Sequence, residues 1–193
     1  MLQIGLSGGI GSGKSTVATI LEKMGYPVFY SDDAAKSLYQ TNDALKQELQ
    51  NILGEEVYRD GQFQKEVLAE HIFNNPEVKS HIAAIVHPLV RASFQEWASQ
   101  QKAPLVFNEA AILFETGAYL QFDATVLVTA PIELRIQRVQ QRDGLQRAAI
   151  LQRIDNQWPD DQKRSLTPFQ IQNDGQPLLI QVEKLVSQLL ELK

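Results

Sequence analysis

The stretch Gly8–Ser15 constrains the fold of this chain more than any other. It reads GGIGSGKS and matches the pattern G-x-x-x-x-G-K-[ST]. A short apolar run, residues 2–6, precedes it, and residues 14–24 follow with apolar side chains at helical spacing. A second short apolar run, residues 28–30, comes after that helix. Strand, glycine-rich turn, helix and strand in this order form a βαβ unit, which indicates a parallel sheet.

The glycine-rich turn has the chemistry of a polyphosphate cradle. Glycines let successive backbone N–H groups point into one concavity, and the following helix adds its positive dipole end. Lys14 offers an ammonium group to the β- and γ-phosphates, and the Ser15 hydroxyl suits Mg²⁺. The flanking strand and helix disfavour the alternative, a flexible linker. We therefore predict a nucleoside triphosphate site formed by Gly9, Gly11, Ser12, Gly13, Lys14, Ser15 and Thr16.

The rest of the chain alternates between strand-like and helix-like segments. Short β-branched and aromatic runs predict strands at 105–107 and 125–129, and a last short strand is expected at 169–172. Helical patterns cover residues 34–39, 45–53, 65–73, 77–86, 89–101, 132–142, 147–157 and 178–192. Residues 55–64 are expected to be a loop, and Pro88 to break the helix at His87. We predict a three-layer α/β core with a parallel five-stranded sheet, a helical insert and a helical lid.

Composition limits the classes to which the chain can belong. It has 193 residues, a formal net charge of −5 and no cysteine. The lack of cysteine excludes disulfides, thiolate nucleophiles and cysteine-ligated zinc, and it fits a reducing compartment. The negative charge argues against a broad nucleic-acid surface, and no apolar run is long enough to span a membrane. We expect a cytoplasmic protein that acts on small molecules.

Three carboxylates follow predicted strands and are candidates for chemistry. Asp32 and Asp33 come after residues 28–30, and Glu109 follows residues 105–107. Ligands of open parallel sheets bind at the carboxyl ends of the strands, where a carboxylate can orient a hydroxyl and accept its proton. Both aspartates also suit the alternative role of capping the next helix. Glu109 stands where an acidic group supports a metal ion or its waters, with an exposed carboxylate as the alternative.

Arginines gather after the fourth predicted strand. Arg135, Arg138 and Arg142 are three and four residues apart, so they share one helix face. Guanidinium groups on one face suit a transferring phosphoryl group, whereas a solvated face would need more carboxylate partners than the segment offers. The chain also lacks the N-K-x-D and D-x-x-G motifs of guanine-nucleotide switches. We therefore predict a small-molecule kinase with a lid.

The sequence resembles the dephospho-CoA kinase family along nearly its whole length. The likeness rests on residues 5–18 (GLSGGIGSGKSTVA), Asp32 with Ala35-Lys36, Ile72-Phe73, His87-Pro88-Leu89-Val90-Arg91, Leu113-Phe114-Glu115, residues 140–144 (QQRDG), Arg153-Ile154 with Gln157, and Asn173-Asp174-Gly175. Few families carry the extended glycine-rich loop, the His-Pro block and the Leu-Phe-Glu block in this order.

This resemblance implies an ATP-dependent kinase that phosphorylates the ribose 3′-hydroxyl of dephospho-CoA in the last step of coenzyme A synthesis. It implies a core (residues 1–39, 101–134 and 160–193), a helical CoA-binding insert (about 40–100) and a lid (about 135–159). The implied catalytic groups are Asp32 as general base with Lys14, Arg138 and Arg142. Arg142 and Asn173 join the ATP site, and Mg²⁺ falls to Ser15 and to Glu109, directly or through water. The implied acceptor site contains Asp32, His87, Pro88, Arg91, Phe114 and Glu115.

The sequence departs from the family pattern at three loop edges. Tyr30 replaces the first aspartate of the family's D-A-D motif, so Asp32 is supported and Asp33 is shifted by one residue. Ala110-Ala111 and Thr167-Pro168 replace the usual Val-Pro and Ala-Asp.

Another small-molecule or nucleoside monophosphate kinase is one alternative function, and a nucleotide-dependent switch or assembly module is another. We expect a monomer, with a small homo-oligomer as the alternative.

Overall fold

The computed structural model describes residues 1–192, apart from the side chain of Asn74. The chain divides into two compact units, Met1–Tyr30 with Gln100–Lys193, and Ser31–Ser99. This boundary differs from the expected one, which assigned residues 31–39 to the core. These residues belong with the second unit because the helix that they form packs its apolar side chains, such as Leu38, against the core of that unit.

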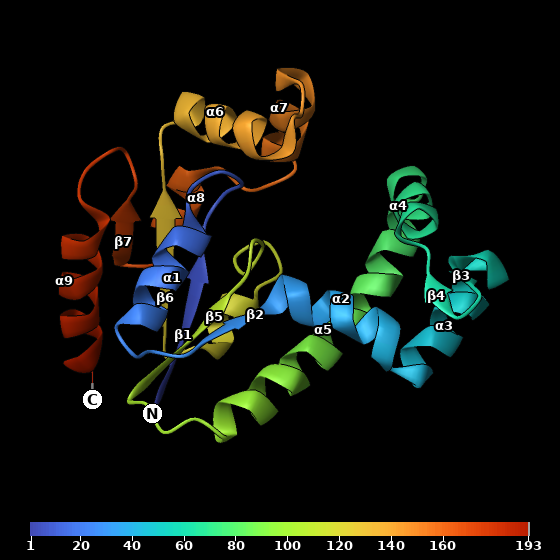
Figure 1. The fold of residues 1–193 in the computed structure, drawn as a ribbon, viewed down its shortest axis with the longest axis horizontal. Coiled ribbons are helices and arrows are strands. Elements are labelled where there is room, and N and C mark those ends of the chain that lie inside the picture. Colours follow the sequence, from blue (N-terminus) through green and yellow to red (C-terminus); the bar gives the residue numbers. More distant parts are fainter. Residues whose placement is uncertain (193) are drawn as a thin grey trace. The chain divides into compact units, whose positions relative to one another are not determined.

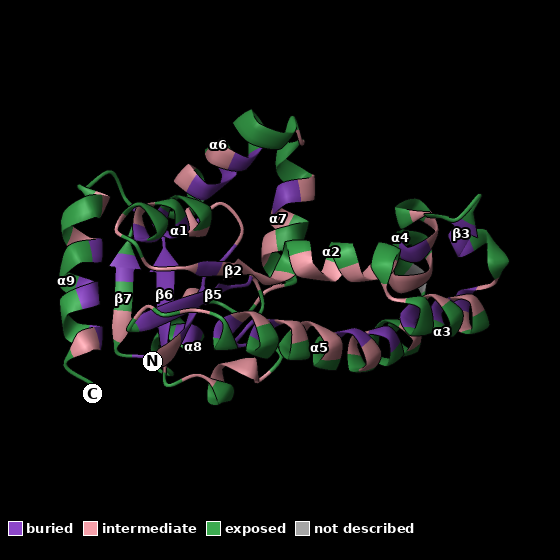
Figure 2. Cartoon of the chain, turned by 60° about the horizontal axis from the view of Figure 1, so that its bottom comes forward, coloured by how far each residue is buried: buried purple, intermediate pink, exposed green. Residues whose placement is uncertain are grey.

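The first unit is built on a parallel five-stranded sheet in the order β2-β5-β1-β6-β7 (Figure 1). Its strands are β1 (Leu2–Ser7), β2 (Val28–Tyr30), β5 (Leu105–Glu109), β6 (Ala124–Thr129) and β7 (Phe169–Gln172). Every residue of β5 is buried, as are most residues of β1 and β6 (Figure 2). Near-continuous burial is the mark of parallel strands covered on both faces, and it confirms the predicted fold class.

The first unit contains α1 (Lys14–Lys23), η2 (Ala118–Gln121), α6 (Ile132–Asp143), α7 (Arg147–Asp155), α8 (Asp160–Arg164) and α9 (Leu178–Leu190). Helices α1 and α9 pack on one face of the sheet, where Leu21 and Leu185 are buried with Leu6 of β1. Neighbouring residues of a strand point to opposite faces. Gly5 therefore faces the other side, where a Cβ atom would lie 3.0 Å from Leu113. No helix of residues 1–192 is both long and apolar enough to cross a membrane.

The second unit is a helical bundle with a small hairpin. Its elements are α2 (Ser31–Thr41), α3 (Asp43–Leu53), η1 (Glu55–Val57), β3 (Tyr58–Arg59), β4 (Gln62–Phe63), α4 (Lys65–Asn74) and α5 (Pro76–Ser99). Asn42 caps α3, since its side chain accepts a hydrogen bond from the Leu45 N–H at 2.9 Å. Leu45 and Leu49 are buried with Ile82 and Val86 of α5, so the unit has a core of its own.

Two expectations for this unit were wrong. Helix α5 runs unbroken through Pro88, although a proline cannot donate its backbone hydrogen bond. The helix continues because Val86 before the proline and Phe94 after it are both buried, and that packing outweighs one missing bond. The expected loop at 55–64 contains the hairpin of β3 and β4, which turns at Asp60-Gly61 with both φ angles positive. That Asp-Gly pair was the sequence signal for the hairpin.

Candidate active site

The phosphate loop, residues Gly8–Ser15, joins the carboxyl end of β1 to the first turn of α1. Gly13 is the N-cap of this helix with φ 95°, and no acidic side chain lies in the first turn. The Ser12 N–H donates to the Gly9 carbonyl at 3.1 Å, which closes the loop on itself. A helix start without a capping side chain or an acidic neighbour favours an anion. The structure thus gives the predicted cradle its strand and helix context.

Glycines in the loop leave room for the groups that support it. A Cβ atom on Gly9 would lie 2.1 Å from Arg135 Nη2, and one on Gly13 would lie 2.0 Å from Asn173 Nδ2. Atoms cannot approach so closely, so a larger residue at either position would displace its neighbour. The glycines therefore serve packing as well as the positive φ that Gly13 requires.

Arg138 and Asn173 hold the loop by its carbonyl oxygens. The Asn173 side chain donates to the Ser12 carbonyl at 2.9 Å, and its Oδ1 accepts from Arg138 Nη2 at 3.0 Å. Arg138 Nη1 also donates to the Gly11 carbonyl at 3.5 Å. Both residues were predicted from the sequence, and the structure brings both to the loop. The contacts that it shows support the loop, and direct contact with a phosphoryl group stays a prediction.

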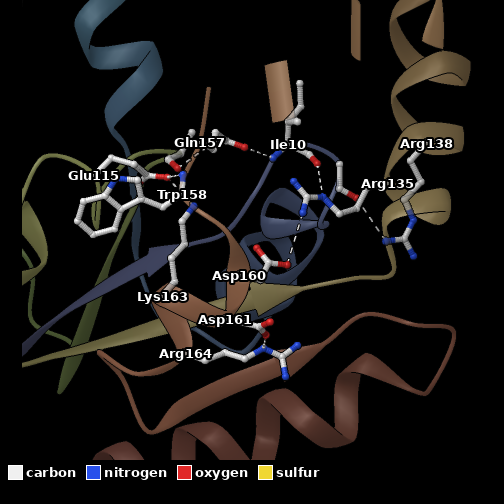
Figure 3. A network of polar contacts seen from close by, with 12 residues as sticks. Ile10, Glu115, Arg135, Arg138, Gln157, Trp158, Asp160, Asp161, Lys163 and Arg164 are labelled. Carbon is white, nitrogen blue, oxygen red and sulfur yellow. Dashed lines mark hydrogen bonds and ion pairs between the residues drawn. The ribbon is translucent and has the colours of Figure 1, made fainter. Parts of the chain in front are cut away.

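Arg135 is buried against the phosphate loop. The residue is 6% exposed, and its Nε donates to the Ile10 carbonyl at 2.9 Å (Figure 3). Its Nη1 lies 3.4 Å from Asp160 Oδ2, which leaves the guanidinium paired. Burial lowers the pKa of Arg135 and the charge of Asp160 partly opposes this shift. The arginine helix face therefore begins with a structural residue that anchors the loop.

Lys14 and Glu109 meet at the carboxyl end of the sheet. Lys14 Nζ lies 3.9 Å from Glu109 Oε1, and the two side chains are 11% and 9% exposed. Glu109 ends β5 and is in register with Leu6 of β1 and Tyr30 of β2. The Ser15 hydroxyl and the Glu109 carboxylate are hard oxygen donors, which suit Mg²⁺ with most of its waters retained. The residues present thus fit the predicted metal.

Arg142 lies in a surface ion pair. Its Nε and Nη2 donate to the two carboxylate oxygens of Asp143 at 2.7 and 2.9 Å. This bond raises the pKa of Arg142 and lowers the pKa of Asp143. The side chain of Arg142 is 63% exposed. Because the guanidinium is paired with Asp143 here, the contact of Arg142 with ATP stays a prediction.

The Leu-Phe-Glu block plays a structural part in this conformation. Phe114 is fully buried, with its ring 5.4 Å from that of Tyr119, so it offers no surface to an acceptor. Glu115 Oε1 lies 2.6 Å from Lys163 Nζ and accepts from the Trp158 N–H at 3.1 Å. The implied part of Phe114 and Glu115 in the acceptor site stays a prediction, because all of these contacts are within the protein. Periodicity could not reveal the ion pair, because Lys163 comes 48 positions later in the chain.

The remaining predicted residues lie in the second unit. Helix α2 begins at Ser31, so Asp32 and Asp33 occupy its first turn, the usual place for helix-stabilising carboxylates. Asp33 Oδ1 accepts from Lys36 Nζ at 2.6 Å. Asp32 is the second residue beyond β2, and its side chain is exposed. The structure thus separates the two aspartates by their partners.

The three predicted acceptor residues of α5 are exposed. His87, Pro88 and Arg91 lie within little more than one turn of this helix. Partial burial of the imidazole, and then the charge of Arg91, lower the pKa of His87. Arg91 supplies positive charge and the neutral imidazole has one N–H donor, so this turn of α5 can bind an anion.

The comparisons with known proteins agree on one family. A family model described as dephospho-CoA kinase matches residues 2–178. A dephospho-CoA kinase of Bacteroides fragilis is 39% identical over 188 residues, which cover 96% of this chain and 92% of that protein. One from Thermus thermophilus is 40% identical over 172 residues, 89% of this chain and 83% of that protein. The crystal structure of TT1252 from Thermus thermophilus aligns with a TM-score of 0.86 at 37% identity, over 98% of this chain and 96% of that chain. The chain belongs to the dephospho-CoA kinase family.

Proposed function

We propose that this chain transfers the γ-phosphoryl group of ATP to the ribose 3′-hydroxyl of dephospho-CoA, which gives coenzyme A and ADP. The phosphate loop with Lys14 beside Glu109 is the observation that carries the proposal, since such a loop suits phosphoryl transfer and the chain belongs to a kinase family. Phosphoryl transfer of this kind needs positioning and charge neutralisation more than covalent chemistry by the protein.

The phosphate loop and Lys14 bind the triphosphate in this proposal. Backbone N–H groups of the loop and the start of α1 receive the phosphate oxygens, and the Lys14 ammonium neutralises charge between the β- and γ-phosphates. When bound, Mg²⁺ held by Ser15 and by Glu109, directly or through water, supplies further charge neutralisation. Arg138 and Arg142 add positive charge from α6.

Asp32 is the proposed general base. Its carboxylate orients the 3′-hydroxyl of the acceptor and takes the proton as the oxygen attacks phosphorus. The contact between Asp33 and Lys36 at 2.6 Å supports the choice of Asp32, because the neighbouring carboxylate already accepts a charged donor. The same contact supports the proposal that Asp33 does not replace the family aspartate whose position Tyr30 occupies.

His87, Pro88 and Arg91 are proposed to bind the acceptor on α5. Dephospho-CoA carries a pyrophosphate, and a guanidinium such as that of Arg91 binds phosphate oxygens with fork geometry. Phe114 and Glu115 are proposed to act on the acceptor side only through the backbone that their packing holds in place.

An acceptor assay tests the function. ADP formation from ATP is measured with dephospho-CoA, AMP, dCMP and shikimate under the same conditions. We expect turnover with dephospho-CoA to exceed turnover with each of the others. Preference for another acceptor would make the chain a different small-molecule kinase. ATP-induced structural change without acceptor-stimulated ADP release would support the switch or assembly module.

A further inference from the structure

Ile10, in the middle of the phosphate loop, is bound at both polar groups of its backbone by side chains from the α6–α7 region. Its carbonyl accepts from Arg135 Nε at 2.9 Å, and its N–H donates to Gln157 Oε1 at 2.8 Å. Arg135 is in the first turns of α6, and Gln157 follows the end of α7 (Figure 3). Residues from the beginning and from the end of the α6–α7 region thus contact the same loop residue.

The chain around Gln157 is held at several points. Gln157 Nε2 donates to the Ala111 carbonyl at 3.4 Å, just beyond β5. The next N–H, that of Trp158, donates to Glu115, whose carboxylate pairs with the fully buried Lys163. Asp160, three residues after Gln157, pairs with Arg135. Residues 157–160 therefore form a strap, tied on one side to the segment after β5 and on the other to the phosphate loop.

We propose that Gln157 is a positioning residue for the triphosphate, which fixes the phosphate loop at Ile10 before ATP arrives. The inference rests on the proposed binding of ATP phosphates by this loop. Gln157 contacts the loop backbone at Ile10, and the proposal gives it no contact with a substrate. Its role is to hold one peptide in the orientation that the loop needs.

The need for such a residue follows from the loop's composition. Ile10 lies between Gly9 and Gly11, and glycines lose more conformational freedom on ordering than other residues. A loop that is already ordered spares the ligand this cost and binds it more tightly. The Arg135 contact fixes the carbonyl side of the Ile10 residue, and the Gln157 contact fixes the amide on its other side. Together they resist rotation of the backbone at this residue.

The test replaces Gln157 by methionine, which keeps the length of the side chain and removes both its hydrogen-bonding groups. The dissociation constants of ATP and of inorganic tripolyphosphate are measured by calorimetry. We expect both to rise roughly 5- to 30-fold, the range that corresponds to one or two lost hydrogen bonds. The KM for dephospho-CoA is expected to stay unchanged. Faster hydrogen exchange of the Ile10 amide is the structural readout.

Gln152→Met is the matched control, since Gln152 is an exposed residue of α7 and receives the same substitution. It should leave both affinities unchanged. Gln157→Ala removes the same groups without filling their space, and is expected to weaken binding of both phosphates to a similar extent, so the test does not depend on one variant. If the variants lose thermal stability but bind ATP and tripolyphosphate like the wild type, the positioning role is refuted. If the wild type itself binds neither compound, the proposed function fails instead.

Discussion

Lys14 Nζ and Glu109 Oε1 lie 3.9 Å apart, and both side chains are nearly buried. Opposite charges in a poorly solvated place attract each other more strongly than on the surface. Glu109 therefore holds the Lys14 ammonium group at the end of β5 in the absence of a triphosphate. The same carboxylate is the proposed support for Mg²⁺, so it has to serve two cations.

Glu109→Gln tests this double role. The amide keeps the shape of the side chain but loses its charge, so it supports Mg²⁺ less well and leaves Lys14 without its anionic neighbour. We expect turnover to fall roughly 10- to 100-fold, as for other outer-shell metal ligands. The concentration of Mg²⁺ that gives half-maximal rate should rise. Steady-state rates across a Mg²⁺ titration measure both effects.

Glu22→Gln is the matched control for this experiment. Glu22 is exposed on α1, the helix that follows the phosphate loop, and carries the same functional group. The Mg²⁺ dependence of this variant should match that of the wild type. An identical Mg²⁺ dependence in Glu109→Gln would contradict the metal assignment.

Asp32→Asn tests the general base. An amide still accepts a hydrogen bond but cannot take the proton, so turnover should fall roughly 10²- to 10⁴-fold. ATP affinity should hardly change, because the residue acts on the acceptor. Asp33→Asn is the control, since it removes the neighbouring carboxylate and its contact with Lys36. Turnover within a few-fold of wild type in Asp32→Asn, or equal losses in the two variants, would show that the base is elsewhere.

The sequence predicts the sheet well because local pattern and topology agree there. The apolar run at 2–6 and the glycine-rich turn at 8–15 allow one strand assignment before the first helix, and parallel pairing follows from the helices between the strands. The helix break predicted at Pro88 does not occur, because burial of Val86 and Phe94 outweighs the local cost of the proline, and that burial exists only in the packed helix.

The supporting contacts of the site were beyond sequence reasoning. The motif identifies Lys14 and Ser15, but nothing local says that Arg135 turns to a carbonyl while Arg138 reaches Asn173. The partner of Arg138 comes 35 residues later in the chain. Long-range hydrogen bonds of this kind have no period in the sequence, so the shared helix face could not predict the different partners of the three arginines.

His87 gives a pH-dependent test of the acceptor site. Its pKa lies below the ordinary value through partial burial and the charge of Arg91, so the ring is neutral at pH 7. Anionic phosphates nearby favour the protonated ring, so bound dephospho-CoA should raise this pKa. By linkage, the acceptor should bind more tightly as pH falls through the interval between the bound and free pKa values.

NMR titration of the imidazole measures these shifts. In the free protein, Arg91→Gln should raise the pKa of His87, because it removes the neighbouring positive charge. Dephospho-CoA should raise it in the wild type, whereas ATP alone should not. A pKa that ignores dephospho-CoA would remove His87 from the acceptor site.

The buried ion pair of Glu115 and Lys163 predicts that removing one partner destabilises the fold much more than replacing both. Lys163 Nζ lies 2.6 Å from Glu115 Oε1 without the geometry of an aligned hydrogen bond, and Glu115 Oε2 is buried with no hydrogen-bond partner among the described residues. Lys163→Met leaves the carboxylate buried and unpaired, which should lower the free energy of unfolding by about 3–5 kcal/mol. The double variant Glu115→Leu with Lys163→Met should recover most of this loss, because an incompletely bonded pair is close in free energy to apolar side chains of similar volume.

Urea denaturation of the two variants and the wild type measures the difference. Because Glu115 also accepts from the Trp158 N–H, the double variant loses the tie that holds the strap while regaining stability. Its ATP affinity should therefore fall even though its fold is restored, which separates the two roles of the pair. A double variant as unstable as Lys163→Met alone would show that the pair is needed for the fold itself.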